Sequence, residues 1–278
     1  MNFFRTREGA LSTEDSKTQL TTLGSQTAPG PLLVLGSATH LKAVRAAGVN
    51  SGAAAVQYAM FGRLEGPGID RGSFVFPISA GGTAVATGAH QKSWSKRLPV
   101  NIKVTPGQEI LLFAEAVGGD GDTYQASITL EFGTEAGPEG EVLSEITVEG
   151  DITAVDTLTR LTTQGSVTAP SRLTPPDAKM LKRVFFAVGS DAAADGEVTY
   201  LLRLSGDAIK GGEQTITLGA ESFIDVATAG DGQGTNLGAG ILDNLDLEIT
   251  PNETLDISLE MNGVDVGTAT AVVSAQFV

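Results

Sequence analysis

Alternation of apolar and polar residues over short segments is the main pattern of this chain, and it predicts β-strands throughout. The clearest example is LDISLEM at residues 255–261, where every second side chain is apolar. Asn262-Gly263 follows, a pair favoured in tight hairpin turns, and residues 268–278 are expected to return as the partner strand. Residues 110–117 and 124–132 repeat this arrangement around a Gly- and Asp-rich turn. The pattern therefore predicts two similar hairpins.

Further strand candidates are short, rich in β-branched or aromatic residues, and close to turn residues. They are residues 56–64, 72–78, 98–104, 142–148, 183–188, 197–204, 214–218 and 245–249. Helix is expected only in short pieces, at residues 39–47, 88–94 and 176–181. Strands that follow one another without alternating helices favour β-sandwiches or barrels over a parallel α/β sheet.

Short sequence motifs occur twice in the same order along the chain. LTTLGSQTAP at residues 20–29 returns as LTTQGSVTAP at residues 161–170, an offset of 141 residues. VTP at residues 104–106 returns as ITP at residues 249–251, so the offset drifts by only a few residues. Solenoid repeats have periods of roughly 20 to 50 residues, so this long period indicates a duplicated domain.

We therefore predict an all-β protein built from two tandem, eight-stranded, jelly-roll-like sandwiches related by internal duplication. The first sandwich is assigned to residues 20–135 and the second to residues 161–278. Residues 1–19 are predicted to be an N-terminal arm outside the repeat, and residues 136–160 a connector with room for one strand. The segment 30–60 of the first sandwich departs from the expected jelly-roll pattern, because it is rich in Ala and Gly and has no clean opening strand.

Composition and charge narrow the class of protein. The 278 residues are 41% hydrophobic, enough for a core in each domain, and no apolar run is long enough to span a membrane. The net charge of −15 is uneven, because residues 1–140 carry −1 and residues 141–278 carry −14. A strongly acidic surface argues against sequence-specific nucleic-acid binding, which needs clustered Lys and Arg. With no cysteine, disulfides and thiolate metal sites are excluded.

Candidate chemistry is sparse, so we expect no enzyme, no cofactor and no metal site. The only histidines are His40 and His90, and no known nucleophile, phosphate-loop or zinc motif is present. Acidic glycine-rich loops at residues 118–122 and 230–236 offer oxygen ligands, but they lack the EF-hand spacing, and hairpin tips favour Gly and Asp for conformational reasons. An aromatic content of 5% provides little stacking surface for a sugar-binding cleft.

Two groups of residues are candidate contact sites. The first is a set in the arm that we expect to face the interior of an assembly: Phe3, Phe4, Arg5 and Arg7. The second is the densest basic cluster, in which an aromatic ring accompanies three cations: Lys92, Trp94, Lys96 and Arg97. Three charges are a weak nucleic-acid signal, so a subunit contact or a solvated loop is the simpler interpretation.

The two tandem Cys-free β domains, the arm and the Gly/Thr-rich turns resemble the double jelly-roll major capsid proteins of icosahedral viruses of bacteria and archaea, in their compact form with short loops. The resemblance implies a homotrimer with a pseudo-sixfold outline. It also implies contacts with neighbouring capsomers and with other virion proteins such as a penton. Such shells often enclose a membrane, which the N-terminal arm would reach. The implied location is the virion capsid, after synthesis in the host cytoplasm.

Two alternatives share the lack of a catalytic site. One is a phage capsid decoration, fibre or tail component built from tandem β-sandwiches. The other is an extracellular carbohydrate-binding module. Oligomeric mass, particle formation and retention on glycan distinguish the three functions.

Overall fold

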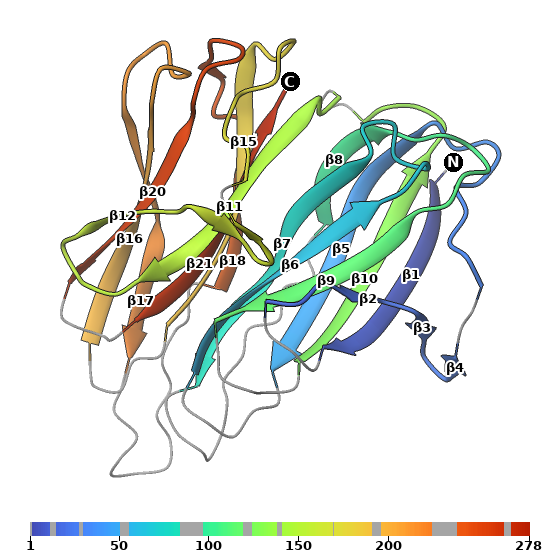
Figure 1. Cartoon of the computed structure of the whole chain (residues 1–278), viewed down its shortest axis with the longest axis horizontal. Coiled ribbons are helices and arrows are strands. Elements are labelled where there is room, and N and C mark those ends of the chain that lie inside the picture. The colour runs from blue at the N-terminus through green and yellow to red at the C-terminus, as the bar shows by residue number, and fades with distance from the viewer. Residues whose placement is uncertain are drawn as a thin grey trace.

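The computed structural model describes residues 2–11, 15–27, 30–50, 56–83, 97–118, 124–137, 141–168, 170–190, 196–223, 238–263 and 268–278. Regular structure in these residues is entirely β, in four antiparallel sheets that form two sandwiches side by side (Figure 1). The prediction of an all-β fold with two tandem sandwiches is thus confirmed.

The first sandwich contains the strands β1 (Asn2–Leu11), β2 (Thr18–Gln19), β3 (Thr22–Leu23), β4 (Gln26–Thr27), β5 (His40–Asn50), β6 (Val56–Glu65), β7 (Ser73–Thr83), β8 (Arg97–Lys103), β9 (Leu111–Val117) and β10 (Tyr124–Gly133). One of its sheets has the order β4-β3-β1-β10-β5-β8, and the other β2-β9-β6-β7.

The second sandwich contains β11 (Ser144–Ile152), β12 (Leu158–Arg160), β13 (Thr163–Gln164), β14 (Val167–Thr168), β15 (Met180–Ser190), β16 (Gly196–Ser205), β17 (Gln214–Phe223), β18 (Gly238–Leu242), β19 (Leu247–Glu248), β20 (Asp256–Gly263) and β21 (Ala269–Phe277). Its sheets follow β14-β13-β11-β21-β15-β18 and β12-β20-β16-β17, the same order as in the first sandwich. Each is a jelly-roll-like sandwich of two antiparallel sheets, and each sheet combines strands from the beginning and the end of its unit.

Small details of the two sandwiches also coincide. The isolated bridge between Leu33 and Glu109 has its counterpart between Leu173 and Thr254. A β-bulge shifts the β6–β7 register after Met60, and the same bulge shifts the β16–β17 register after Tyr200. Matching irregularities at matching positions support duplication of one ancestral domain.

Two expected helices are absent, because one segment is a strand and the other is a turn that enters a strand. Residues 39–47 fall largely in β5, and residues 176–181 lead into β15. Each of these strands is hydrogen-bonded on both sides, β5 to β10 and β8, and β15 to β21, β18 and β19. Pairing on two edges outweighs a local helical propensity worth a few tenths of a kcal/mol per residue. The third expected helix, at residues 88–94, lies outside the described residues.

The prediction of a free N-terminal arm is wrong for residues 2–11. All ten residues of β1 pair with β10, just as β11 pairs with β21. The apolar pattern of the sequence does not reveal β1, because Arg5 and Arg7 occupy the register positions at which the second sandwich has the core residues Ile146 and Val148. The alternation that marks a strand is therefore visible in only one copy.

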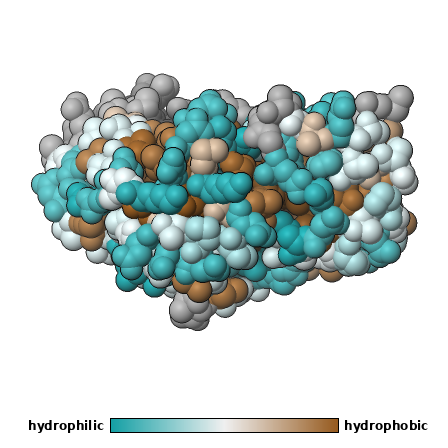
Figure 2. Space-filling model, turned by 90° about the horizontal axis from the view of Figure 1, so that it is seen from above, coloured by the Kyte–Doolittle hydropathy of each residue, from teal (hydrophilic) through white to brown (hydrophobic). Residues whose placement is uncertain are grey.

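Each sandwich has its own core, and a third small cluster joins them. The first core includes Tyr58 and Tyr124, whose ring centroids are 5.5 Å apart. The joining cluster includes Phe61 and Val75 from the β2-β9-β6-β7 sheet, with Ala187 and Val272 from the second sandwich. Viewed from above, apolar residues lie between hydrophilic ones along the long axis (Figure 2). The contact between sandwiches is thus a packed apolar layer.

The backbones of two glycines approach each other closely where the sandwiches meet. A Cβ atom added to Gly189 on β15 would lie 2.3 Å from the carbonyl oxygen of Gly81 and 2.5 Å from its nitrogen, at the end of β7. Backbone atoms held in two sheets cannot move aside as a flexible side chain can. Glycine at position 189 therefore sets the spacing between the sandwiches.

We expect Gly189→Ala to destabilise the protein by about 1–3 kcal/mol, the usual cost of overpacking a close contact. Urea unfolding followed by circular dichroism measures the change. Gly36→Ala is the matched control, because an added Cβ there meets nothing within 4 Å. An unchanged unfolding midpoint in Gly189→Ala would contradict the close contact.

Candidate functional site

The outer face of the β11-β21-β15-β18 sheet binds backbone groups of β7, an edge strand of the first sandwich. The Val75 nitrogen donates to Glu145 Oε1 at 2.9 Å, and the Val75 carbonyl accepts from Thr147 Oγ1 at 3.4 Å and Ser274 Oγ at 3.3 Å. The two hydroxyls are also hydrogen-bonded to each other at 2.7 Å. Side chains of one sandwich thus satisfy polar groups that an edge strand leaves open.

Charged groups hold the same contact at two further points. Glu145 forms an ion pair with Arg71, and burial lowers the pKa of Arg71 to about 9, so the guanidinium remains charged at neutral pH. Arg183, whose side chain is 1% exposed, donates to the Pro99 carbonyl at 2.9 Å and lies 3.3 Å from Asp243. Removal of Arg71 or Glu145, both of which are largely buried, leaves the charge of the other without compensation.

Buried carboxylates gather where β9 meets the turn between β13 and β14. Glu115 accepts a hydrogen bond from the backbone of Ser166, and its nearest ion-pair partner is Arg63 at 3.8 Å. Burial raises the pKa of Glu115, although the Ser166 hydrogen bond and the Arg63 charge oppose the shift. Burial also raises the pKa of Glu149, helped by the charges of Asp15 and Asp151.

The raised pKa of Glu115 predicts how its contribution to stability changes with pH. Between the ordinary pKa of 4.5 and the higher folded value, the folded state binds more protons than the unfolded state. The stability contribution of Glu115 therefore falls as pH rises through this interval. Glu115→Gln keeps an oxygen that can accept from Ser166 and removes the charge.

We expect Glu115→Gln to gain stability relative to the wild type as pH rises from about 4.5 to 7. Thermal unfolding of both proteins over this range measures the difference. Glu65→Gln is the control, because Glu65 is partly exposed and pairs with Lys17 at the surface. A stability difference that is constant with pH would contradict a raised pKa at position 115.

The four residues predicted to face an assembly interior take different positions on β1. Phe3 packs partly against the first core, whereas Phe4 is 54% exposed and Arg5 is exposed. Arg7 is buried and donates to the Thr6 carbonyl and, at 2.8 Å, to the Gly30 carbonyl. Burial lowers the pKa of Arg7, as does the charge of Arg5. The structure therefore does not bring these four side chains to one surface.

The predicted basic patch can be followed at one position only. Arg97 begins β8 and forms an ion pair with Glu131 at 2.9 Å. The other members, Lys92, Trp94 and Lys96, lie outside the described residues. A role for the patch as a contact site stays a prediction.

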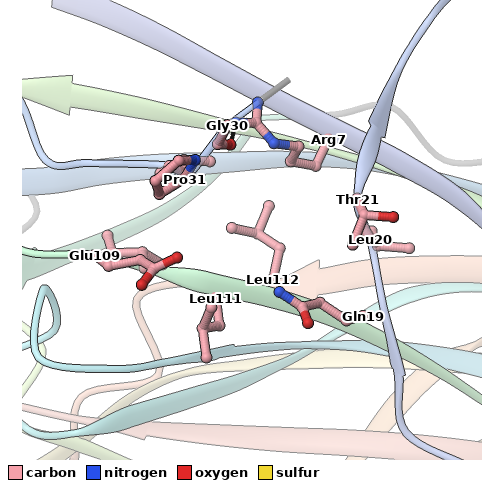
Figure 3. A pocket seen from close by; sticks show the side chains of 11 residues that line it. Arg7, Gln19, Leu20, Thr21, Gly30, Pro31, Glu109, Leu111 and Leu112 are labelled. Carbon is pink, nitrogen blue, oxygen red and sulfur yellow. Dashed lines mark hydrogen bonds between the residues drawn. The ribbon is translucent and has the colours of Figure 1, made fainter. Parts of the chain in front are cut away.

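Beside Arg7 lies a cavity of about 260 Å³ at the β1 edge of the first sandwich. Figure 3 shows Arg7 next to Gly30 and Pro31 on one side, and Glu109 and Leu111 on the other. Arg7 and Glu109 are the titratable side chains in its lining. A single carboxylate beside a guanidinium that is already bound to carbonyls does not form an acid–base pair of the kind used in hydrolysis.

No group of three or more His, Asp or Glu side chains in the described part of the chain is arranged to hold a metal ion. His40 begins β5, where its ring lies 2.9 Å from the hydroxyl of Thr39. His90 and most of the acidic loops considered for calcium fall outside the described ranges. Those ranges also contain no helix long and apolar enough to cross a membrane.

No protein-family profile matches this chain, and no curated protein matches it by sequence. Among solved structures it is similar to a peptide-N(4)-(N-acetyl-β-D-glucosaminyl) asparagine amidase, with 8% identity, a TM-score of 0.33, and 99% of this chain and 96% of that one covered. A tandem CBM22 domain of Paenibacillus barcinonensis Xyn10C has 10% identity, a TM-score of 0.23 and coverage of 97% and 93%.

A T=1 nodavirus of Penaeus vannamei has 12% identity to this chain, a TM-score of 0.23 and coverage of 99% and 97%. The similarities are distant, and they extend to viral shells, to a glycan-processing enzyme and to a carbohydrate-binding tandem alike. They select none of these functions for this chain.

Proposed function

We propose that this protein is a structural coat subunit that forms trimeric, pseudo-hexameric capsomers and tiles an icosahedral shell. The observation that carries the proposal is that one chain supplies two jelly rolls of the same strand order in the same orientation. Gly81 and Gly189 meet where β7 and β15 end, whereas Val75 near the start of β7 contacts Thr147 near the start of β11. The two sandwiches therefore lie side by side in the same orientation (Figure 1).

Aligned units suit a lattice because three such chains present six similar edges. Closed assemblies are commonly cyclic, and a repeated heterologous contact closes into a ring when the rotation between units allows it. Two equivalent domains in one chain let a threefold ring fill a sixfold position. The unequal charges of the two halves, −1 and −14, reduce the sixfold equivalence to threefold.

The residues of the interior-facing arm play no part in this proposal. Because β1 contributes ten paired residues to a sheet, deletion of residues 1–15 removes a strand and exposes the first core. Loss of assembly after that deletion would report unfolding, so the test of function needs the full chain.

We expect the purified protein to have three times the 28.5 kDa mass of the chain by light scattering, and to give hexagonal outlines, sheets or closed particles by negative-stain electron microscopy. A trimer that binds only preformed phage heads would instead favour a decoration protein. A monomer retained on immobilised glycan would favour a carbohydrate-binding module, and either result would reject the coat function.

A further inference from the structure

Among the described residues, two sheet faces are not covered by the other sandwich, and they lie at opposite ends of the long axis of the molecule (Figure 1). One is the outer face of β1, β10 and β5, here called the head face. The other is the outer face of β12, β20, β16 and β17, here called the tail face. We infer that the head face of one copy binds the tail face of a second copy, repeating the contact that already joins the two sandwiches. The inference rests on the proposed function, for which it supplies the contact between chains.

The head face carries a counterpart of the polar centre of the internal contact. Thr6 Oγ1 and Thr129 Oγ1 are hydrogen-bonded at 2.9 Å, as Thr147 and Ser274 are at 2.7 Å in the second sandwich. The register is equivalent, because Thr6 pairs with Thr129 across β1 and β10 as Thr147 pairs with Ser274 across β11 and β21. In the second sandwich the hydroxyls bind Val75, whereas those of the head face are half-buried.

The tail face carries the counterpart of Val75. In the first sandwich Val75 pairs with Arg63, and in the second Thr215 pairs with Arg203. Thr215 lies on the edge strand β17 and is exposed, as an unoccupied equivalent of Val75 should be. Its backbone can therefore meet the hydroxyl pair of another copy as Val75 meets the internal pair.

The surroundings of these two positions are also preserved. Arg63 lies 3.8 Å from Glu115 on β9, and Arg203 lies 3.1 Å from Glu260 on β20. With the shared bulge after Met60 and Tyr200, the tail face repeats the strand register of the face that is already buried inside the chain.

Exposed apolar side chains mark the head face as a contact surface. Phe4 is 54% exposed and Val49 is 41% exposed, and both point outward on this sheet. Their register equivalents are Glu145 and Gly189, which both lie in the internal contact. Because Val49 has a side chain where Gly189 has none, the contact between chains must be more open at that end. The contact is therefore expected to be weaker than the internal one.

Charge favours head-to-tail pairing over pairing of two tail faces. Residues 1–140 carry −1 and residues 141–278 carry −14, so a contact between two tail faces would bring two acidic halves together. A head-to-tail contact pairs the acidic half with a nearly neutral one. Like charges at an interface oppose association and select against the wrong orientation.

Site-specific disulfide formation tests the contact, because the chain has no cysteine of its own. Thr129→Cys protein is mixed with Thr215→Cys protein under mild oxidation, after circular dichroism has shown that both are folded. The expected main product is a disulfide-linked dimer between the two variants. Each variant alone should give little dimer, since a head-to-tail contact does not place equal positions opposite each other.

Thr21→Cys mixed with Thr215→Cys is the matched control, because Thr21 is an exposed threonine of the first sandwich outside the head face. Equal cross-linking in this control, or none in the Thr129–Thr215 mixture, overturns the inference. A trimer without the Thr129–Thr215 cross-link leaves the coat function standing and rejects this contact. Cross-linked open chains of indefinite length support the contact and reject the closed trimer.

Discussion

The structure depends on the close seating of the edge strand β7 against the outer face of the second sandwich. At one end, Gly81 and Gly189 approach so closely that no Cβ fits between them. At the other end, Val75 exchanges hydrogen bonds with Glu145, Thr147 and Ser274. Steric closeness fixes the spacing and the hydrogen bonds fix the register, so the two domains are held together as one unit.

The head face of the first sandwich corresponds to the outer face of the β11-β21-β15-β18 sheet in the second. Duplication followed by divergence explains why these two faces now differ. In the internal contact, Phe185 and Arg183 are buried and Gly189 meets the backbone of Gly81. The head face keeps a polar hydroxyl pair, and it has Arg45 at the register position of Phe185. One face is thus buried within the chain, whereas the other carries exposed side chains.

Two buried carboxylates, Glu115 and Glu149, lie where the sandwiches meet. Burial raises the pKa of both Glu115 and Glu149, and Asp15 and Asp151 add negative charge nearby. Burial of an unneutralised carboxylate costs stability, which protonation relieves. Both glutamates also hold the turn around Gly165. Glu149 accepts hydrogen bonds from Thr163 and Gly165, and Glu115 accepts one from Ser166.

The sequence by itself determined the β class and the duplication, because strand alternation and the motifs at residues 20–29 and 161–170 are local and repeat in order. The sequence did not reveal β1, because Arg5 and Arg7 interrupt its apolar pattern. It predicted a helix over residues 39–47, most of which lie in β5, because the strand pairing that decides this segment is long-range. Only the tertiary structure decided which sheet faces are buried. That choice depends on Gly81 meeting Gly189, and on Val75 meeting Thr147, residues more than 70 positions apart whose proximity no local pattern encodes.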